Sequence, residues 1–148
     1  MSKPAARLEA IWLKGGRREA MRPVSGARMV KDVGLEGNAD RGGYRQVTLL
    51  DADAWERATS ELGVVVDPIE RRANLLVRGL DLAESADRVV RVGASRIRIR
   101  GETRPCERMD EAAPGLREAL DPDWRAGAYG MVIEGGPVTV GDPVAWEA

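Results

Sequence analysis

The sequence predicts a mostly β protein, a closed or nearly closed β-barrel with a few short helices. Val and Ile recur in short runs separated by Gly, Pro and Asp, which is the pattern of many short strands joined by turns. Only two segments have the periodicity of a helix, which is too few for a parallel sheet flanked by helices. A length of 148 residues suits one compact core, so we expect a single domain over residues 1–148.

Alternating and continuous apolar runs locate the strands. Arg96–Arg100 alternates strictly, so Ile97 and Ile99 are expected to face the core and the three arginines to face outward. Asn74–Val77 is a short apolar run, typical of a strand buried on both faces. The other predicted strands are Arg7–Lys14, two short strands within Arg22–Val33, Arg45–Leu50, Val89–Val92, Tyr129–Glu134 and Val138–Val140, with Val144 and Trp146 closing the sheet.

Glycines and helix caps define the turns and the helices. Gly135–Gly136 separates two of these strands and indicates a hairpin turn. Asp53–Leu62 is predicted as a helix, because its first residue forms a capping-box pattern with Glu56 and Gly63 follows its last residue. A second short helix is predicted at Pro114–Leu120, with proline near its start.

The composition excludes several classes of chemistry and of partner. The chain has no histidine and one cysteine, which excludes a Ser-His-Asp triad, a Cys-His dyad and a Cys/His zinc site. A net charge of −1 gives no general attraction to nucleic acid or to an anionic membrane. The N-terminal MSKPAARLEA lacks the apolar run of a secretory signal, and no stretch approaches the roughly 20 apolar residues of a membrane span. With a lone cysteine that cannot form an internal disulfide, the expected location is the cytoplasm.

The first candidate for chemistry is Cys106, in the segment GETRPCERM after the RIRIR strand. Pro105 removes a backbone donor beside it, and Arg104 and Arg108 favour the reactive thiolate. The acidic neighbours oppose that effect; they are Glu102, Glu107 and Asp110. The alternative is that the free cysteine is simply a small buried hydrophobic residue. A loop crowded with charge favours the functional interpretation.

Two further segments carry side chains suited to binding an anionic ligand. Arg71 and Arg72 precede Asn74; guanidinium groups bind phosphate bidentately, and an amide can both donate to and accept from a heterocycle edge. The alternative for this segment is a solvated basic surface. Residues 34–47 (GLEGNADRGGYRQV) form a glycine-rich loop where the backbone turns sharply or approaches a ligand, with Arg45 near its end as another candidate.

In this order, the segments resemble the MOSC domain, the C-terminal domain of molybdenum cofactor sulfurases. The matching stretches are GLEGNAD, RQVTLLD, RRANLLVRGLDL, RPCERM, PGLREAL, AGAYGMVIEGG and VTVGDPV, which together cover about residues 34–146. The chain is most similar to the short stand-alone bacterial members. The resemblance implies one MOSC-type domain, a mostly β barrel like that of pyruvate kinase, with a ligand cleft.

The resemblance also implies a function for individual residues. Cys106 falls on the family's cysteine, which serves as a persulfide sulfur carrier or as a molybdenum ligand, and Arg72 and Asn74 fall on the family's Arg-Asn stretch. The implied cofactor is molybdopterin, with Arg71, Arg72, Asn74, Arg104 and Arg45 as candidate contacts. A reductase of N-hydroxylated compounds or a sulfurtransferase is the implied activity. A small-molecule substrate and a sulfur donor or partner enzyme are the expected partners, without nucleic acid or membrane.

One departure from the family pattern lies in the glycine-rich loop. Family members usually have Gly-Asp followed shortly by His, whereas here Asn38 stands in place of the acid and Asp40 lies near the position of the histidine. The departure supports a second hypothesis, a non-catalytic accessory domain that recruits a partner enzyme.

Overall fold

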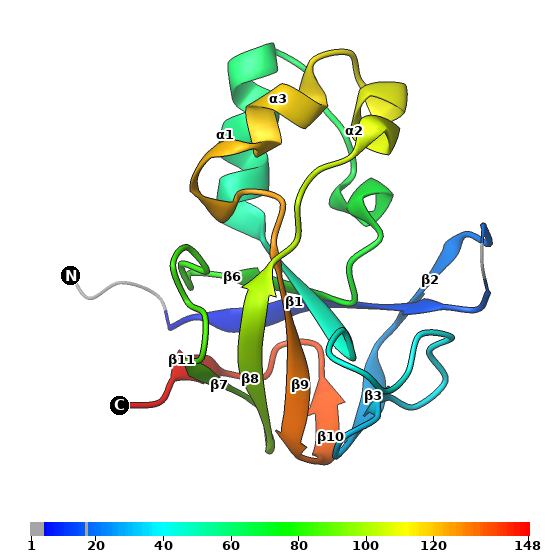
Figure 1. Cartoon of the computed structure of the whole chain (residues 1–148), viewed down its shortest axis with the longest axis vertical. Helices are drawn as coiled ribbons and strands as arrows, with labels where there is room; N and C mark the ends of the chain where they lie inside the picture. The colour runs from blue at the N-terminus through cyan, green and yellow to red at the C-terminus, as the bar shows by residue number, and fades with distance from the viewer. Residues whose placement is uncertain (1–4, 17) are drawn as a thin grey trace.

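The computed structural model describes residues 5–16 and 18–148, and it is mostly β with three short α-helices gathered at one end of the molecule (Figure 1). The N-terminal MSKPAARLEA, expected to lack a secretory signal, falls partly on residues 1–4, outside the described residues. No helix within the described part of the chain is long and apolar enough to span a membrane. The elements are β1 (Arg7–Lys14), β2 (Met21–Val24), β3 (Gly26–Val30), β4 (Gly34–Leu35), β5 (Val47–Asp51), α1 (Ala52–Leu62), the 3₁₀ turn η1 (Pro68–Arg71), β6 (Leu75–Arg78), β7 (Val89–Val92), β8 (Ser95–Glu102), α2 (Glu107–Ala112), α3 (Leu116–Leu120), the 3₁₀ turn η2 (Pro122–Trp124), β9 (Ala128–Glu134), β10 (Gly136–Thr139) and β11 (Val144–Trp146).

The strands form two sheets. The larger has the order β11-β7-β8-β9-β5-β6-β1-β2, and the smaller has the order β10-β3-β4. Only β5 and β6 pair in parallel; the other strand pairs of the described residues are antiparallel. Because β5 and β6 run in the same direction, the residues that precede both strands lie at one edge of the sheet, and the residues that follow both lie at the other.

The predicted closed barrel is not confirmed. Among the described residues, no strand pairing closes either sheet on itself, and β11 and β2 are the edges of the larger one. An isolated bridge joins Arg7 of β1 to Pro143, and Leu8 N donates to Asp142 O at 2.8 Å. These contacts bring β1 beside the segment that leads into β11, so the larger sheet is strongly curved.

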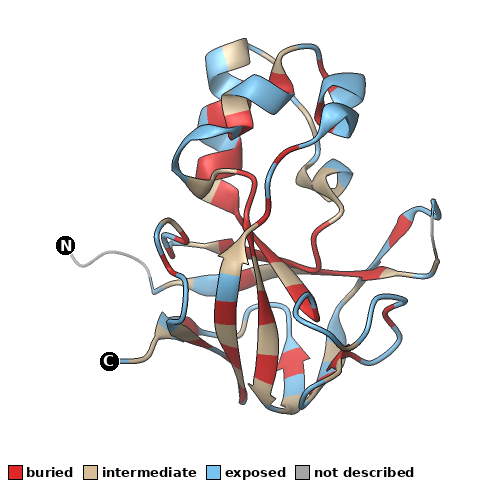
Figure 2. Ribbon diagram, viewed as in Figure 1, coloured by how far each residue is buried: buried red, intermediate tan, exposed pale blue. Residues whose placement is uncertain are grey.

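Two apolar cores lie on opposite faces of the strands β1, β5 and β6. Leu49 and Leu75 belong to the core between the sheets, whereas Leu50 and Leu76, one residue further along, belong to the core beneath the helices. Buried residues accordingly occupy both the strands and one side of α1 (Figure 2). A strand covered on both faces must be apolar at successive positions, which explains the continuous run NLLV.

Helix α1 begins at a different cap from the one predicted. Asp51, the last residue of β5, accepts hydrogen bonds from Asp53 N at 2.9 Å and Ala54 N at 3.3 Å, so Asp51 and not Asp53 is the N-cap. The carboxylate of Asp53 instead binds Arg78 and the Gly79 amide. The predicted end is confirmed, since Gly63 adopts φ 69° and closes the helix.

The predicted hairpin at Gly135–Gly136 is wrong. β9 pairs with β5 and β8 in the larger sheet, whereas β10 pairs with β3 in the smaller one. A Cβ atom at Gly135 would lie 2.6 Å from Met29 O, and Gly136 has φ 153°. The two glycines therefore let the chain pass closely over β3 and change sheets.

The remaining predicted strands are confirmed, with ends shifted by a few residues. The two strands within Arg22–Val33 are β2 and β3, and the alternation of Arg96–Arg100 continues through β8 with Ile97 and Ile99 buried. The second predicted helix is α3, which starts at Leu116 after Gly115 rather than at the proline. The sequence patterns did not predict α2 or β4.

Candidate functional site

A pocket of about 330 Å³ lies at the edge of the sheet where β5 and β6 begin. Thr48 lines it near the start of β5, Asn74 lies just before β6, and Thr103 follows β8. Cys106 stands at its wall, so segments far apart in the sequence meet here. We call it the Cys106 pocket.

The Cys106 pocket is strongly basic in a chain of net charge −1. Two carboxylates line it, those of Asp40 and Glu70. Among residues 5–16 and 18–148, five cationic side chains line it; they are Lys14, Arg45, Arg71, Arg72 and Arg108. Like charges held close together repel one another, and an anion between them removes that repulsion. The pocket is therefore suited to an anionic ligand.

Cys106 presents its thiol from an anchored backbone. It is the exposed N-cap of α2, its side chain makes no capping hydrogen bond, and its carbonyl accepts from Met109 N at 2.9 Å. Pro105 before it and Met109 after it are buried, which fixes the backbone on both sides. The alternative of a buried apolar thiol is wrong, because Cys106 is accessible from the pocket.

Arg71 connects three of the segments that surround the pocket. From η1, its Nε donates to Ala126 O at 2.8 Å and its Nη2 donates to Arg104 O at 3.3 Å. Burial lowers the pKa of Arg71 from its ordinary value, while the negative charge of a Cys106 thiolate acts in the opposite direction. Arg71 therefore both holds the Cys106 segment in place and lies close enough to interact with the thiolate charge.

Arg72 has an unpaired donor in the pocket. It follows η1 in the left-handed region, with φ 63°, which is unfavourable for a residue with a side chain. Its Nη2 atom is buried and has no hydrogen-bond partner in the part of the chain that the structure describes. A buried unpaired donor is costly, so Arg72 is a candidate contact for a ligand in this pocket.

Asn74 has a different role from the one expected. Its Oδ1 accepts from Thr48 N at 3.1 Å and from Thr48 Oγ1 at 3.2 Å, and its Nδ2 donates to Trp12 O at 3.1 Å and Asn38 Oδ1 at 3.2 Å. The amide therefore has no free donor with which to bind a heterocycle edge. Asn74 instead holds β1, β5 and the glycine-rich loop together beneath the pocket.

The two residues that depart from the family pattern are both engaged within the protein. Asn38 is buried; its Oδ1 accepts from Lys14 N at 2.8 Å and its Nδ2 donates to Asp40 O at 3.0 Å. A carboxylate at position 38 could accept but could not donate to the Asp40 carbonyl. The Asp40 carboxylate lies 3.1 Å from Lys14 Nζ.

The structure brings five of the six candidate residues to one pocket; they are Arg45, Arg71, Arg72, Asn74 and Cys106. Arg104 is the exception. Its side chain is 72% exposed, lies 3.7 Å from Glu102 and from Asp121, and does not line the pocket. Only its backbone carbonyl contributes, as an acceptor for Arg71.

Lys14 and Arg108 also line the pocket, and the sequence analysis did not place them there. Lys14 ends β1, which pairs antiparallel with β6, so its position depends on a pairing between distant segments. Arg108 was considered only for its effect on the thiol. It reaches the pocket because α2 begins directly after Cys106. The local sequence pattern did not predict this helix.

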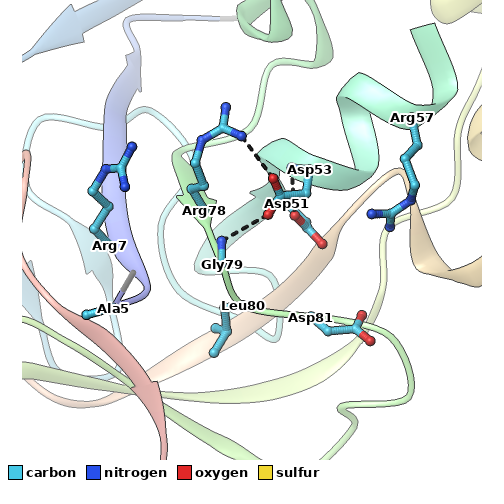
Figure 3. Close-up of a pocket in the computed structure, with 9 residues that line it drawn as sticks. All are labelled: Ala5, Arg7, Asp51, Asp53, Arg57, Arg78, Gly79, Leu80 and Asp81. Atoms are coloured by element: carbon cyan, nitrogen blue, oxygen red, sulfur yellow. Dashed lines mark hydrogen bonds and ion pairs between the residues drawn. The ribbon is translucent and has the colours of Figure 1, made fainter. Parts of the chain in front are cut away.

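A second pocket, of about 440 Å³, lies at the opposite edge of the parallel pair, where β5 and β6 end (Figure 3). We call it the Arg78 pocket. Arg78 lies 2.9 Å from Asp53, which also lines this pocket, and it pairs with two carboxylates outside the lining, Glu9 at 2.7 Å and Glu56 at 2.6 Å. Asp51 caps α1 in its wall, and burial raises the pKa of that carboxyl.

No cluster of three or more acidic or cysteine side chains suited to holding a metal ion is present in the part of the chain that the structure describes.

Comparisons with known proteins agree with the fold. The family model described as MOSC domain matches residues 36–145. The YuaD protein from Bacillus subtilis shares 17% identity with this chain and superposes with a TM-score of 0.77, over 95% of this chain and 94% of that one. YiiM from Geobacillus stearothermophilus (13% identity, TM-score 0.73, 97% of this chain and 75% of that one) and YiiM from Escherichia coli (17%, 0.70, 96% and 70%) are also similar. No curated protein sequence matches.

Proposed function

Because the chain belongs to the MOSC domain family, known from proteins related to molybdenum cofactor sulfurases, we propose that the Cys106 pocket binds a molybdopterin-type cofactor or handles sulfur for one. In the first case the Cys106 thiolate is a metal ligand, and in the second it carries a persulfide sulfur. The observation that carries the proposal is the accessible thiol beside Arg71, in a pocket where the Arg72 guanidinium has an unpaired buried donor.

The residues present fit such a group. A thiolate is a soft ligand suited to a thiophilic metal, and arginine matches the oxygen pairs of a phosphate. Arg72 and Arg108 would hold the phosphate, and Arg71 would hold the Cys106 segment while its charge stabilises the thiolate. When bound, the group supplies two-electron redox chemistry at molybdenum, of which the reduction of N-hydroxylated compounds is one example.

As a sulfur carrier, Cys106 would act through its own thiolate. The thiolate attacks the outer sulfur of a donor persulfide, a new S–S bond forms on Cys106, and the donor leaves as a thiolate. This role requires a free, reduced cysteine, which fits the reducing cytoplasm expected from the sequence.

A second candidate is a non-catalytic accessory domain. The observation that favours it is the engagement of Asn38 and Asp40 in internal contacts, which leaves the glycine-rich loop without a free acid and base. In this case the fold is retained for recruiting a partner enzyme, and Cys106 has no chemical role.

The test is the analysis of protein purified from a host that makes the cofactor. We expect about one molybdenum and one pterin per chain or, for the sulfur carrier, the mass gain of one sulfur atom on Cys106. Cys106→Ser should lose the metal or the added sulfur. Its melting temperature should be unchanged or slightly higher, because serine is a good N-cap and the native thiol caps nothing.

Arg104→Ala is the matched control, since it removes a charged side chain two residues away that points outside the pocket. It should retain the molybdenum and pterin. Protein that carries no molybdenum, no pterin and no persulfide would contradict the proposal and support the accessory domain. A clearly destabilised Cys106→Ser protein with full metal content would contradict the role of the thiol.

A further inference from the structure

A surface of arginine and tyrosine side chains, exposed except for the half-buried Tyr129, adjoins the Cys106 pocket. It consists of Tyr44, Arg45, Arg100 and Tyr129, and we call it the shelf. Arg45 belongs to both sites: it lines the pocket, and its guanidinium carbon lies 4.8 Å from the centre of the Tyr129 ring. Arg100 lies 5.6 Å from the centre of the Tyr44 ring. Arg45 therefore joins the cationic pocket to a surface of planar tyrosine and guanidinium groups.

Two irregularities of the backbone of β8 make room for the shelf. The register between β8 and β9 shifts between Ile99 and Gly101, which leaves Arg100 as an extra residue beside Tyr129. A Cβ atom at Gly101 would lie 2.9 Å from the Tyr129 hydroxyl and 3.1 Å from its ring carbons. Only glycine lets the Tyr129 ring lie this close to the strand. Bulges and strand glycines are common where a side chain is redirected toward a ligand.

Tyr44 is the outermost part of the shelf. It follows Gly42 and Gly43, both at positive φ, and is 69% exposed, which makes it the only exposed aromatic side chain in residues 5–16 and 18–148. An exposed aromatic ring beside a guanidinium is an arrangement that stacks planar, electron-rich rings. Arg100 lies over this ring, which otherwise remains largely exposed to solvent.

We propose that the shelf stacks the planar ring of a ligand whose phosphate lies in the Cys106 pocket. The class of ligand is a phosphorylated heterocycle, that is, a nucleoside phosphate, either free or as the terminal part of a larger cofactor. The proposal rests on the anion binding assigned to the pocket and adds a second recognition element, which selects for a ring outside it.

The experiment compares guanosine 5′-monophosphate with ribose 5-phosphate, which has the phosphate but no ring, by titration calorimetry on the cofactor-free protein. We expect the nucleotide to bind about tenfold more tightly, since stacking of one base has an effect of this order. Tyr44→Leu should abolish this preference and leave the affinity for ribose 5-phosphate unchanged. Val65→Ala, which changes a fully exposed residue elsewhere, is the control and should retain the preference.

Equal affinities for the two ligands, or a preference that survives Tyr44→Leu, would contradict ring stacking on the shelf and leave the proposed function intact. Failure of both ligands to bind would refute the anion pocket itself. An affinity that rises with the length of an oligoribonucleotide would also overturn the small-molecule assignment.

The source of the ring is tested separately on protein purified from the cofactor-producing host. A nucleobase released by acid in a one-to-one ratio with pterin supports a ring that is part of the cofactor. Pterin without a nucleobase, together with binding of the free nucleotide, supports a nucleotide substrate.

Discussion

A pocket lies at each end of the β5–β6 pair, and charged side chains line both. The two pockets differ in how far these charges are paired with one another. Arg78, which lines the Arg78 pocket, lies 2.6–2.9 Å from three carboxylates; Asp53 also lines this pocket (Figure 3), whereas Glu9 and Glu56 lie outside its lining. Among the described residues, five cationic side chains and two carboxylates line the Cys106 pocket; of these only Lys14 and Asp40 form an ion pair, at 3.1 Å, and the buried Nη2 of Arg72 has no partner. The Arg78 pocket is the larger, at about 440 Å³ against about 330 Å³.

The pairing of charges therefore distinguishes these two pockets better than their volumes do. Charges that satisfy one another stabilise the fold and leave little with which to bind a ligand. Charges held without partners reduce stability, and a ligand of opposite charge recovers that loss. We therefore assign the Arg78 pocket to the stability of the fold and the Cys106 pocket to binding.

The largest expected effect concerns the Arg78 pocket. Arg78→Met keeps much of the packing volume but removes the charge that joins Glu9, Asp53 and Glu56. Because the Arg78 side chain is only 27% exposed, we expect the free energy of unfolding to fall by about 2 kcal/mol. Urea unfolding measures this loss of stability. Ligand binding at the Cys106 pocket should not change.

The same variant should have a distinct pH dependence. The hydrogen bond from Arg78 lowers the pKa of Glu56, so this contribution to stability is present above the pKa of the unfolded chain and is lost as the pH falls through the lowered value. The difference between wild type and Arg78→Met should therefore shrink below about pH 4. Arg104→Met, whose arginine makes only long ion pairs at 3.7 Å, should cost less than about 0.5 kcal/mol.

The next effect has opposite signs in stability and binding. Arg72→Gly removes the unpaired cation and places glycine where φ is 63°. We expect the free energy of unfolding to rise by about 0.5–1 kcal/mol, since glycine adopts this conformation without strain. Phosphate binding, measured by calorimetry, should weaken about tenfold because a charge-assisted hydrogen bond is lost. A variant that loses stability and keeps its affinity would reverse the assignment of Arg72.

The smallest expected effect concerns Asp51. Burial raises the pKa of its carboxyl, so its contribution to stability is full below the pKa of the unfolded chain and is lost as the pH rises through the raised value. Asp51→Asn keeps an acceptor for the amides of Asp53 and Ala54. At neutral pH its stability should match or slightly exceed that of wild type, and the decline as the pH rises through the raised pKa of Asp51 should disappear. A loss of more than about 1 kcal/mol would show that the charge itself stabilises α1.

Local sequence patterns correctly predicted the elements whose structure depends mainly on residues close together in the sequence. The alternation in β8 follows from one buried and one open face, and the end of α1 follows from Gly63. The start of α1 was ambiguous, because Asp51 and Asp53 are both good caps and only the end of β5 selects between them. The Gly135–Gly136 pair is compatible both with a hairpin turn and with a change of sheet. Which of the two forms depends on the pairing of β10 with β3, a distant segment.

The residues of the Cys106 pocket divide in the same way, into those that the local sequence predicted and those whose position depends on distant segments. Cys106 and Arg72 followed from a resemblance carried by contiguous stretches of sequence. Arg104 was a candidate contact and Arg108 was not, because the position of Arg108 depends on α2, a six-residue helix whose N-cap, Cys106, makes no side-chain capping hydrogen bond and whose Met109 is buried. The amide of Asn74 was assigned to a ligand because sequence cannot show that Thr48, Trp12 and Asn38 already use it.

Strand β9 lies in the middle of the larger sheet but is nearly the last strand in the chain. Val47 of β5 pairs with Gly130 of β9, so the ladder between these strands joins segments separated by more than half of the chain. Closing so long a loop precedes any gain from the pairing, which places this fold among the slower two-state folders, in the range of milliseconds to seconds. During synthesis, β5 has an open apolar edge until β9 emerges, and this interval is when the nascent chain is most prone to aggregate or to bind a chaperone.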